Sequence, residues 1–401
     1  MEAIDKKVKL SNKIYPIFAG ISSDLLFWIV IQTLFLTNVK HFNAAQISSL
    51  TAFSGVVTIL LQSVLLKIIK RIGNVKSVKL GTILLLCSAV AITFGNNYII
   101  VLLGQILTEI AFAFKSMDNV ILRKNLKYLN ETNTYINYQN KKTLIYSGIT
   151  MFISIIAGSL FNINNYLPML LCIGVCVINV IMANFFYEYN DRLEEHNDNN
   201  KIKFSFTKVA ILLLLLQLLL YPIIELSQQN GQLLIQYNLE SFLKPEKVAI
   251  YLSIIVTLSR ISRVISNVFF PRVYVKLKNK TLYLIEVLLI LALISIIFAN
   301  FINEKNISIT MLAIGFCILL ALRDPVENFV NTQLLNNTDT NKHEQVIIYF
   351  RLARQIGKFI ISSLITLILL KFDLVYAMVF LLGISIIFVT IVVKKLITLL
   401  R

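Results

Sequence analysis

Two carboxylates inside long apolar stretches are the residues of this chain best suited to do chemistry. Asp24 lies near the middle of an apolar run over residues 14–39, and Glu225 lies at the same place in a run over residues 207–237. Runs of 18 or more apolar residues are typical of transmembrane helices. A charge near the centre of such a helix costs about 3 kcal/mol, so it usually faces a cavity or a partner. We therefore expect both carboxylates to face a polar site within the membrane.

The side chains around these carboxylates predict a polar stripe on one face of each helix. Trp28 and Gln32 follow Asp24 at four-residue steps, and Tyr221 precedes Glu225 by four residues. Amides and aromatic rings at this spacing could bind a polar ligand, or they could instead bond and pack between helices. The predicted site for the substrate or a coupling ion comprises Asp24, Trp28, Gln32, Glu109, Tyr221, Glu225, Gln228, Gln229, Gln232 and Arg260.

Proton coupling would have to use carboxylates, because the expected spans contain no histidine. Asp24 and Glu225 are the symmetric candidates. In a low-dielectric cavity each would bind a proton more tightly unless it were paired. The alternative is a static ion pair of Asp24 or Glu225 with Arg260, which would hold the helices together.

A second group of charges lies toward the expected cytoplasmic ends of the helices. Arg351, Arg354 and Lys358 share one helix face, and Asp324 and Glu327 could pair with them as part of a gate. The alternative is that the basic residues attract an anionic substrate. The predicted gate network comprises Arg71, Gly73, Lys115, Asp118, Arg263, Asp324, Glu327, Arg351 and Arg354.

The elements that must position these residues are apolar blocks long enough to span a membrane. Of the 401 residues, 57% are hydrophobic, whereas soluble proteins average about 45–50%. We therefore expect an all-α membrane protein with twelve transmembrane helices. The expected spans cover residues 14–39, 47–66, 78–95, 98–118, 143–161, 167–187, 207–237, 246–270, 281–301, 307–331, 345–370 and 374–393.

The net charge of +17 is best explained by membrane topology. Lys and Arg concentrate in alternate loops, beginning with the N-terminal segment. These loops include a basic loop at 67–79 and the polar stretch 123–142. Within 123–142 we expect a short interfacial helix. This bias is typical of cytoplasmic loops. We expect a multi-pass protein of the cell membrane with both termini in the cytoplasm, in contact with the lipid bilayer and with no nucleic-acid partner.

Similar residues recur at nearly constant offset in the two halves of the chain. Ser23-Asp24-Leu25 corresponds to Ile224-Glu225-Leu226. Asp118-Asn119 corresponds to Glu327-Asn328, and we expect these two acidic pairs to close the fourth and the tenth helix. This repetition predicts two six-helix bundles related by a pseudo-two-fold axis. We expect an N-terminal bundle over 1–187, a cytoplasmic linker over 188–206 and a C-terminal bundle over 207–401.

Twelve spans, a central linker and parallel half-repeats resemble the major facilitator superfamily. That family carries Gly-x-Leu-x-Asp-Arg-x-Gly-Arg-Lys between its second and third helices, and Arg71 and Gly73 match this pattern. Lys70 stands where the family has the Asp that joins a charge network at the inner gate, so the chain departs from the usual latch. The resemblance implies transport by alternating access.

We interpret the chain as a secondary active transporter of a small molecule, coupled to an ion or to protons, and acting as a monomer. The histidines His41, His196 and His343 are scattered in expected loops, so we expect no metal site. The sequence has no nucleotide-binding pattern of the Gly-x-x-x-x-Gly-Lys-Ser/Thr kind, and we expect no cofactor and no enzyme activity. The alternatives are a transporter-like scaffold or receptor without flux, or a multidrug-type efflux pump if the direction is export.

Overall fold

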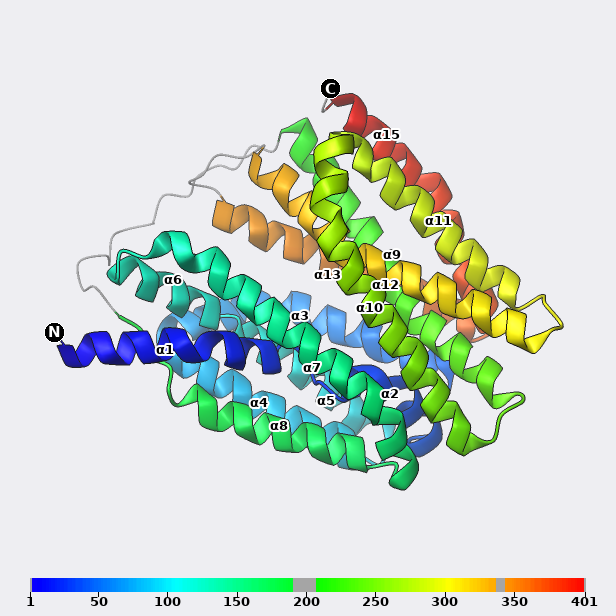
Figure 1. Ribbon diagram of the computed structural model, residues 1–401, viewed down its shortest axis with the longest axis horizontal. Coiled ribbons are helices and arrows are strands. Elements are labelled where there is room, and N and C mark those ends of the chain that lie inside the picture. Colours follow the sequence, from blue (N-terminus) through cyan, green and yellow to red (C-terminus); the bar gives the residue numbers. More distant parts are fainter. Residues whose placement is uncertain (1, 190–206, 337–342, 400–401) are drawn as a thin grey trace. The chain divides into compact units, whose positions relative to one another are not determined.

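A computed structural model describes residues 2–189, 207–336 and 343–399 (Figure 1). Every regular element in these ranges is a helix. Up to residue 189 the helices are α1 (Glu2–Ile21), α2 (Trp28–Leu34), η1 (Phe35–Val39), α3 (Ala44–Ile72), α4 (Asn74–Phe94), α5 (Tyr98–Lys115), α6 (Asp118–Tyr128), η2 (Thr132–Thr134), α7 (Tyr135–Ile163) and α8 (Leu167–Ala183).

The remaining helices follow from residue 208 onward. They are α9 (Lys208–Glu240), α10 (Pro245–Leu277), η4 (Lys278–Lys280), α11 (Thr281–Ala299), α12 (Lys305–Asn336), α13 (His343–Leu369), α14 (Leu374–Ile384), η6 (Ser385–Val389) and α15 (Thr390–Leu399).

Within the described ranges, nine helical segments are long and apolar enough to cross a membrane. One of them, Lys247–Ala299, includes both α10 and α11, and two shorter apolar helices lie at Trp28–Val39 and Leu167–Ala183. The expected all-α, multi-span class is therefore confirmed. The number of twelve spans and the pseudo-two-fold axis stay predictions.

The chain divides into two compact units that do not follow the chain order. Unit 1 contains the described residues of 1–30, 60–153 and 163–205, and unit 2 contains those of 31–59, 154–162 and 206–401. The predicted division into bundles at 188–206 stays a prediction, because most of that linker lies outside the described residues.

Hydrogen bonds explain why residues 31–59 belong with the C-terminal helices in unit 2. The Gln236 side chain of α9 donates to the Thr37 hydroxyl at 2.6 Å, and the Thr51 hydroxyl of α3 donates to the Gln229 amide oxygen at 3.1 Å. The Ser48 hydroxyl donates to the carbonyl of Ser362 on α13 at 3.3 Å. Polar side chains therefore join α3 and η1 to α9 and α13.

The predicted continuous helix over 14–39 is wrong, because the chain leaves the helical path at residues 22–27. The hydroxyls of Ser22 and Ser23 donate to the carbonyls of Phe18 and Ala19, both at 2.6 Å. Serine side chains that bond back to the preceding turn offer the backbone an alternative to the helix. Asp24 lies in this break, so Asp24, Trp28 and Gln32 do not share one helical face.

The predicted basic loop over 67–79 is also wrong. Helix α3 continues to Ile72 and α4 begins at Asn74, so Gly73 alone separates them. Gly73 has φ 83° and ψ 163°, a backbone region that is essentially reserved for glycine. This requirement gives a physical reason for the glycine at the position that matches the family pattern.

Two further helix ends differ from the sequence-based expectation. The fourth expected span ends at Lys115, and the separate helix α6 begins at Asp118. The short interfacial helix expected within 123–142 stays a prediction, because α6 ends at Tyr128 and α7 already begins at Tyr135. Helix α12 continues to Asn336, so the pair Glu327-Asn328 lies inside a helix and does not close it. The two acidic pairs that looked equivalent in sequence therefore have different local structures.

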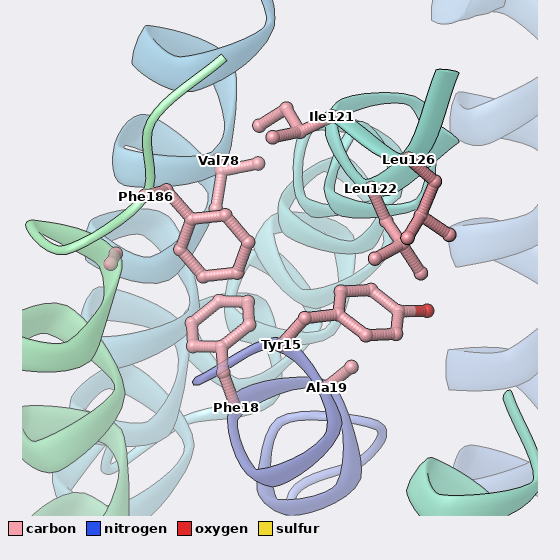
Figure 2. Packing of buried hydrophobic residues seen from close by; sticks show 9 residues of the cluster. Tyr15, Phe18, Ala19, Val78, Ile121, Leu122, Leu126 and Phe186 are labelled. Atoms are coloured by element: carbon pink, nitrogen blue, oxygen red, sulfur yellow. The ribbon is translucent and has the colours of Figure 1, made fainter. Parts of the chain in front are cut away.

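An aromatic and aliphatic core in unit 1 holds α1 against α4 and α6 (Figure 2). Tyr15 and Phe18 of α1 are almost fully buried in it, and the Phe18 and Phe186 rings meet edge to face with centroids 4.7 Å apart. Between membrane helices such contacts stabilise the fold through van der Waals packing, because lipid tails are as apolar as the core. The core also includes Ala19, Val78, Ile121, Leu122, Leu126 and Ala183.

Helix α9 forms the centre of unit 2, where it packs against α12, α13, α14 and α15. Gly357 of α13 lies against the backbone of Leu218 on α9, so closely that an added Cβ would collide with the Leu218 carbonyl oxygen. Small residues at such contacts let membrane helices approach each other closely. Arg354 and Lys358, on either side of Gly357 in the sequence, both reach Glu225 of α9.

We expect Gly73→Ala to destabilise the protein through its backbone alone. A Cβ at Gly73 would meet no atom within 4 Å, whereas the backbone conformation costs a non-glycine residue about 1–3 kcal/mol. Thermal unfolding of the purified protein should therefore show a lower Tm. The matched control is Gly174→Ala in α8, where space is also open and φ is ordinary, so that Tm should be unchanged or higher. Equal effects of the two changes would contradict this account.

Candidate functional site

The Lys115 side chain binds the backbone at the end of α1, where the first expected span is interrupted. Its ammonium donates to the backbone oxygen of Ser22 at 2.5 Å and to the Ser22 hydroxyl at 2.9 Å, and the side chain is only 7% exposed. The ammonium also lies 5.8 Å and 5.7 Å from the ring centroids of Phe18 and Phe112. A cation is favourable at a helix C-terminus, where carbonyls lack partners. Lys115, predicted for the gate, therefore stabilises the end of α1.

Asp24 is held by a tyrosine that the sequence analysis did not single out. The hydroxyl of Tyr146 on α7 donates to Asp24 Oδ2 at 2.5 Å, and Tyr146 is buried. A hydrogen bond to an ionised acceptor is among the stronger kinds in proteins. Nothing in the local sequence around Tyr146 marks it, since the contact joins residues 122 positions apart.

Asp118 belongs to a polar network that links α1, α6 and α7. Asp118 is 1% exposed and stands in the first turn of α6, where a carboxylate is favourable. The Asn119 amide donates to Asp118 Oδ1 at 2.8 Å, and Asn119 Oδ1 accepts from the Tyr15 hydroxyl at 2.7 Å and from Gln139 at 2.8 Å. Asp118, also predicted for the gate, is thereby built into the core of unit 1.

Charged contacts near the matched family motif involve residues other than those predicted. Arg71 is exposed at the end of α3. Beyond Gly73, the amide of Asn74 donates to Glu188 Oε1 at 2.7 Å, and Lys124 Nζ lies 2.6 Å from the same oxygen. Sequence reasoning missed Glu188 and Lys124, because their pairing depends on how α6 packs against the segment that follows α8.

The other residues predicted for the site take varied places. Trp28 is buried at the start of α2, and Glu109 is half-buried in α5. Gln32 is half-buried in α2 within unit 2, and Arg260 is buried on α10 of the same unit. The side chain of Arg351 lies outside the residues that the structure describes.

Unit 2 gathers six charged and aromatic side chains from α9, α12 and α13. Lys358 Nζ lies 2.7 Å from Glu225 Oε1, and Arg354 Nη2 lies 3.9 Å from Glu225 Oε2. Arg354 Nη1 lies 3.9 Å from Glu327 Oε1. We call the following residues the basic cluster: Tyr221, Glu225, Arg323, Glu327, Arg354 and Lys358.

Tyr221 orients both arginines of the basic cluster. The Arg354 guanidinium lies 3.3 Å from the centroid of the Tyr221 ring, and Arg323 Nε donates to the Tyr221 hydroxyl at 3.1 Å. Stacking of a guanidinium on an aromatic face is favourable by about 0.5–2 kcal/mol. Tyr221 is only 2% exposed, so it acts as a fixed platform for the two cations.

The ion pair of Glu225 joins a residue of the predicted site to a residue grouped with the predicted gate. Glu225 was grouped with Arg260, and Lys358 with the gate residues, yet Glu225 and Lys358 form an ion pair. Asp324, expected to face α13, instead accepts two hydrogen bonds from Arg263 of α10, both at 2.7 Å. Asn267 adds a third hydrogen bond to Asp324 at 2.6 Å.

Two glutamines of α9 form hydrogen bonds to neighbouring helices. This was the alternative to ligand binding in the sequence analysis. Gln228 donates to the Leu319 carbonyl at 3.1 Å, and Gln229 donates to the Ile47 carbonyl at 3.5 Å. Gln232 is buried in the same helix. Amides bonded to neighbouring backbone are more suited to holding helices than to binding a ligand.

No family model matches this sequence, and no curated protein sequence matches it. Among solved structures, the nucleoside transporter NupG is similar over 98% of this chain and 99% of its own, with a TM-score of 0.72 and 12% identity. A bacterial homologue of the iron transporter ferroportin, in an inward-facing state, is similar over 99% of both chains, with a TM-score of 0.61 and 16% identity. The chain has the fold of these transporters. At such identities the similarity shows the fold alone.

We expect Lys115→Met to loosen the end of α1. The change keeps an apolar stem but removes the ammonium that binds the Ser22 carbonyl, and loss of a hydrogen bond from a charged group costs about 1.5–3 kcal/mol. Hydrogen exchange by mass spectrometry should show faster exchange over residues 18–24, together with a lower Tm. Lys67→Met, at an exposed lysine of the same unit, should change neither. Unchanged exchange at residues 18–24 in Lys115→Met would show that the ammonium does not stabilise the break.

We expect the Glu225–Lys358 ion pair to show in a double-mutant cycle. Removing one member of a buried ion pair costs up to about 3–5 kcal/mol, because the other charge is left uncompensated. Since the two side chains keep 26% and 14% exposure, Glu225→Gln and Lys358→Gln should each lower Tm by less than that limit implies. The double variant should be more stable than the sum of the single changes predicts. Strict additivity would mean that the pair contributes nothing.

Proposed function

We propose that this chain is a secondary active transporter that moves a small molecule across the cell membrane by alternating access, driven by a coupled ion or by protons. The observation that carries the proposal is the Glu225–Lys358 ion pair, which joins two long apolar helices of a chain with a transporter fold. Ionisable residues inside membrane helices are costly and generally mark transport pathways or proton relays.

The chemistry of this pair supports a role in coupling. Protonation of Glu225 would remove the negative charge that holds Lys358, and the pair could then open and form again without any covalent change. Arg354 and Arg323 on the neighbouring helices would remain held by Tyr221. A change of one proton would thus alter the contact between α9 and α13, which is the kind of switch that a transporter needs.

Asp24 supports the proposal from unit 1. It lies where the first span is broken, and broken helices with exposed backbone groups commonly form the binding sites of secondary transporters. The two similar structures are those of a nucleoside transporter and of a homologue of an iron transporter, so the fold suits small-molecule cargo. We further propose a monomer in the plasma membrane, with both termini in the cytoplasm.

Reconstituted proteoliposomes test this function. Purified protein should move at least one member of a panel of nucleosides, amino acids, sugars, organic anions and cationic drugs, and a pH or ion gradient should change the rate. Asp24→Asn and Glu225→Gln should each lower the flux by at least about tenfold, as expected when a group acting in the rate-determining step is lost. Glu304→Gln, at an exposed acid, is the control and should transport normally.

Two outcomes would contradict the proposal in different ways. Full flux in both carboxylate variants would exclude Asp24 and Glu225 as coupling residues. Absence of flux for every solute, with folded protein in the vesicles, would favour a transporter-like scaffold or receptor.

A further inference from the structure

One face of the N-terminal helix α1 combines lysines with exposed apolar side chains. At about 3.6 residues per turn, Lys6, Lys9, Leu10, Lys13 and Ile17 fall within about 100° of one another around the helix axis. All five side chains are exposed, and Leu10 and Ile17 are each 46% exposed. We call these five residues the lysine face.

The other side of α1 is fixed within unit 1. Figure 2 shows the Tyr15 ring of α1 in the apolar core. Nearer the N-terminus, the Ser11 hydroxyl oxygen accepts a hydrogen bond from the Tyr187 backbone N–H, and the Asn12 side-chain oxygen accepts one from the Asn125 amide, both at 3.2 Å. These contacts fix the rotation of α1 about its axis, so the lysine face points away from the core of unit 1.

The lysine face carries no acid from its first lysine onward. No Asp or Glu stands between Asp5 and Asp24 in the sequence. Asp5 lies on another side of α1, where its Oδ1 accepts a hydrogen bond from the Tyr128 hydroxyl of α6 at 2.6 Å. Lys6, Lys9 and Lys13 therefore place three like charges along about two turns of one helix face, and a surface of this kind attracts an anionic partner.

The apolar members of the lysine face indicate what kind of anion that partner is. Leu10 stands between Lys9 and Lys13, and Ile17 follows four residues after Lys13, on the side of the first expected span. A water-soluble anion gains nothing from exposed leucine and isoleucine side chains. The surface of an anionic bilayer, in contrast, offers phosphate groups directly beside hydrocarbon. Lysine stems can lie along apolar surface while their ammonium groups reach such phosphates.

We propose that the lysine face binds the headgroups of anionic phospholipids and holds α1 at the surface of the bilayer. Lys6, Lys9 and Lys13 bind the phosphates, and Leu10 and Ile17 contact the adjoining hydrocarbon. Near an anionic membrane surface, each lysine contributes about fivefold in affinity. This surface is separate from the residues proposed for transport, and its binding of lipid does not depend on flux.

The test is hydrogen exchange by mass spectrometry over residues 2–13 of the purified protein in detergent micelles with added lipid. The probes are dioleoyl phosphatidylglycerol, which is anionic, dioleoyl phosphatidylcholine, which is zwitterionic, and glycerol phosphate as a soluble anion. With phosphatidylglycerol at ten times its Kd, exchange should be about tenfold slower than with phosphatidylcholine, because bound lipid stabilises the helix to that extent. Glycerol phosphate should leave the exchange unchanged.

Variants of the lysine face separate the contribution of charge from that of apolar contact. The triple variant Lys6→Gln, Lys9→Gln and Lys13→Gln should weaken the apparent affinity for phosphatidylglycerol by at least about tenfold. Replacing the same three residues by arginine keeps the charge and should preserve the affinity. Leu10→Ser should also weaken the effect of the lipid, although the charge of the face is unchanged.

The matched control removes the same charge elsewhere in unit 1. Lys67→Gln, Lys70→Gln and Lys76→Gln, at exposed lysines of α3 and α4, should respond to phosphatidylglycerol over residues 2–13 as the wild type does. Equal loss in this control, or an undiminished effect in the glutamine variant of the lysine face, would overturn the proposal.

The lipids and the salt concentration provide two further checks. Equal exchange with the two lipids would show that the charge of the headgroup does not matter. An effect of glycerol phosphate as large as that of phosphatidylglycerol would replace the bilayer by a soluble anion. If the glutamine variant of the lysine face does not fold, the wild type at about 1 M salt decides, because the Debye length is then about 3 Å. Slower exchange that persists at this salt concentration would contradict binding through charge.

Discussion

A charge among apolar helices must be paired or hydrogen-bonded, and this constraint accounts for the polar interior of both units. In unit 2 it brings Lys358 to Glu225 and Arg263 to Asp324. In unit 1 it places the Tyr146 hydroxyl on Asp24. Water would solvate these groups in a soluble protein, whereas in lipid each unpaired group would cost several kcal/mol. The helices therefore pack so that their few charged side chains meet.

The same constraint applies to backbone groups, and it explains how a broken helix is tolerated near Asp24. Where α1 ends, the carbonyls of its last turn lose their helical partners. The Ser23 hydroxyl donates to the Ala19 carbonyl, and Lys115 donates to the Ser22 carbonyl. The Ser22 hydroxyl adds a second hydrogen bond to the Phe18 carbonyl, which also accepts from the Ser22 backbone N–H. The core around Tyr15 and Phe18 fixes the preceding turns. The break is thus supported on both sides, which lets Asp24 leave the helix axis and reach α7.

Much of the fold followed from the sequence, because long apolar runs have few alternatives in a membrane. The expected ends at 207–237 and 281–301 lie within a few residues of α9 and α11. The break at residues 22–27 did not follow, because its residues are individually compatible with a helix and contacts that stabilise the alternative come from distant positions, Lys115 and Tyr146. Gly73 was identified by its motif, but the sequence did not reveal that this single residue replaces an entire loop.

Predicting the site was harder, because periodicity says which side chains share a face and does not say what they meet. The glutamines of α9 have the spacing expected for a binding surface, and the same spacing serves equally well for bonds to neighbouring helices. Gln228 and Gln229 make such bonds to the backbone of α12 and α3. Glu225, on the same helix, meets Lys358 from a helix 133 residues away. The difference lies in the partner helix: α12 and α3 present carbonyls to the glutamines, whereas α13 presents the cations Arg354 and Lys358 to Glu225. The spacing of a polar stripe in a membrane helix therefore does not reveal which of its side chains hold the helices together by neutral hydrogen bonds and which form ion pairs, because the facing helix decides this.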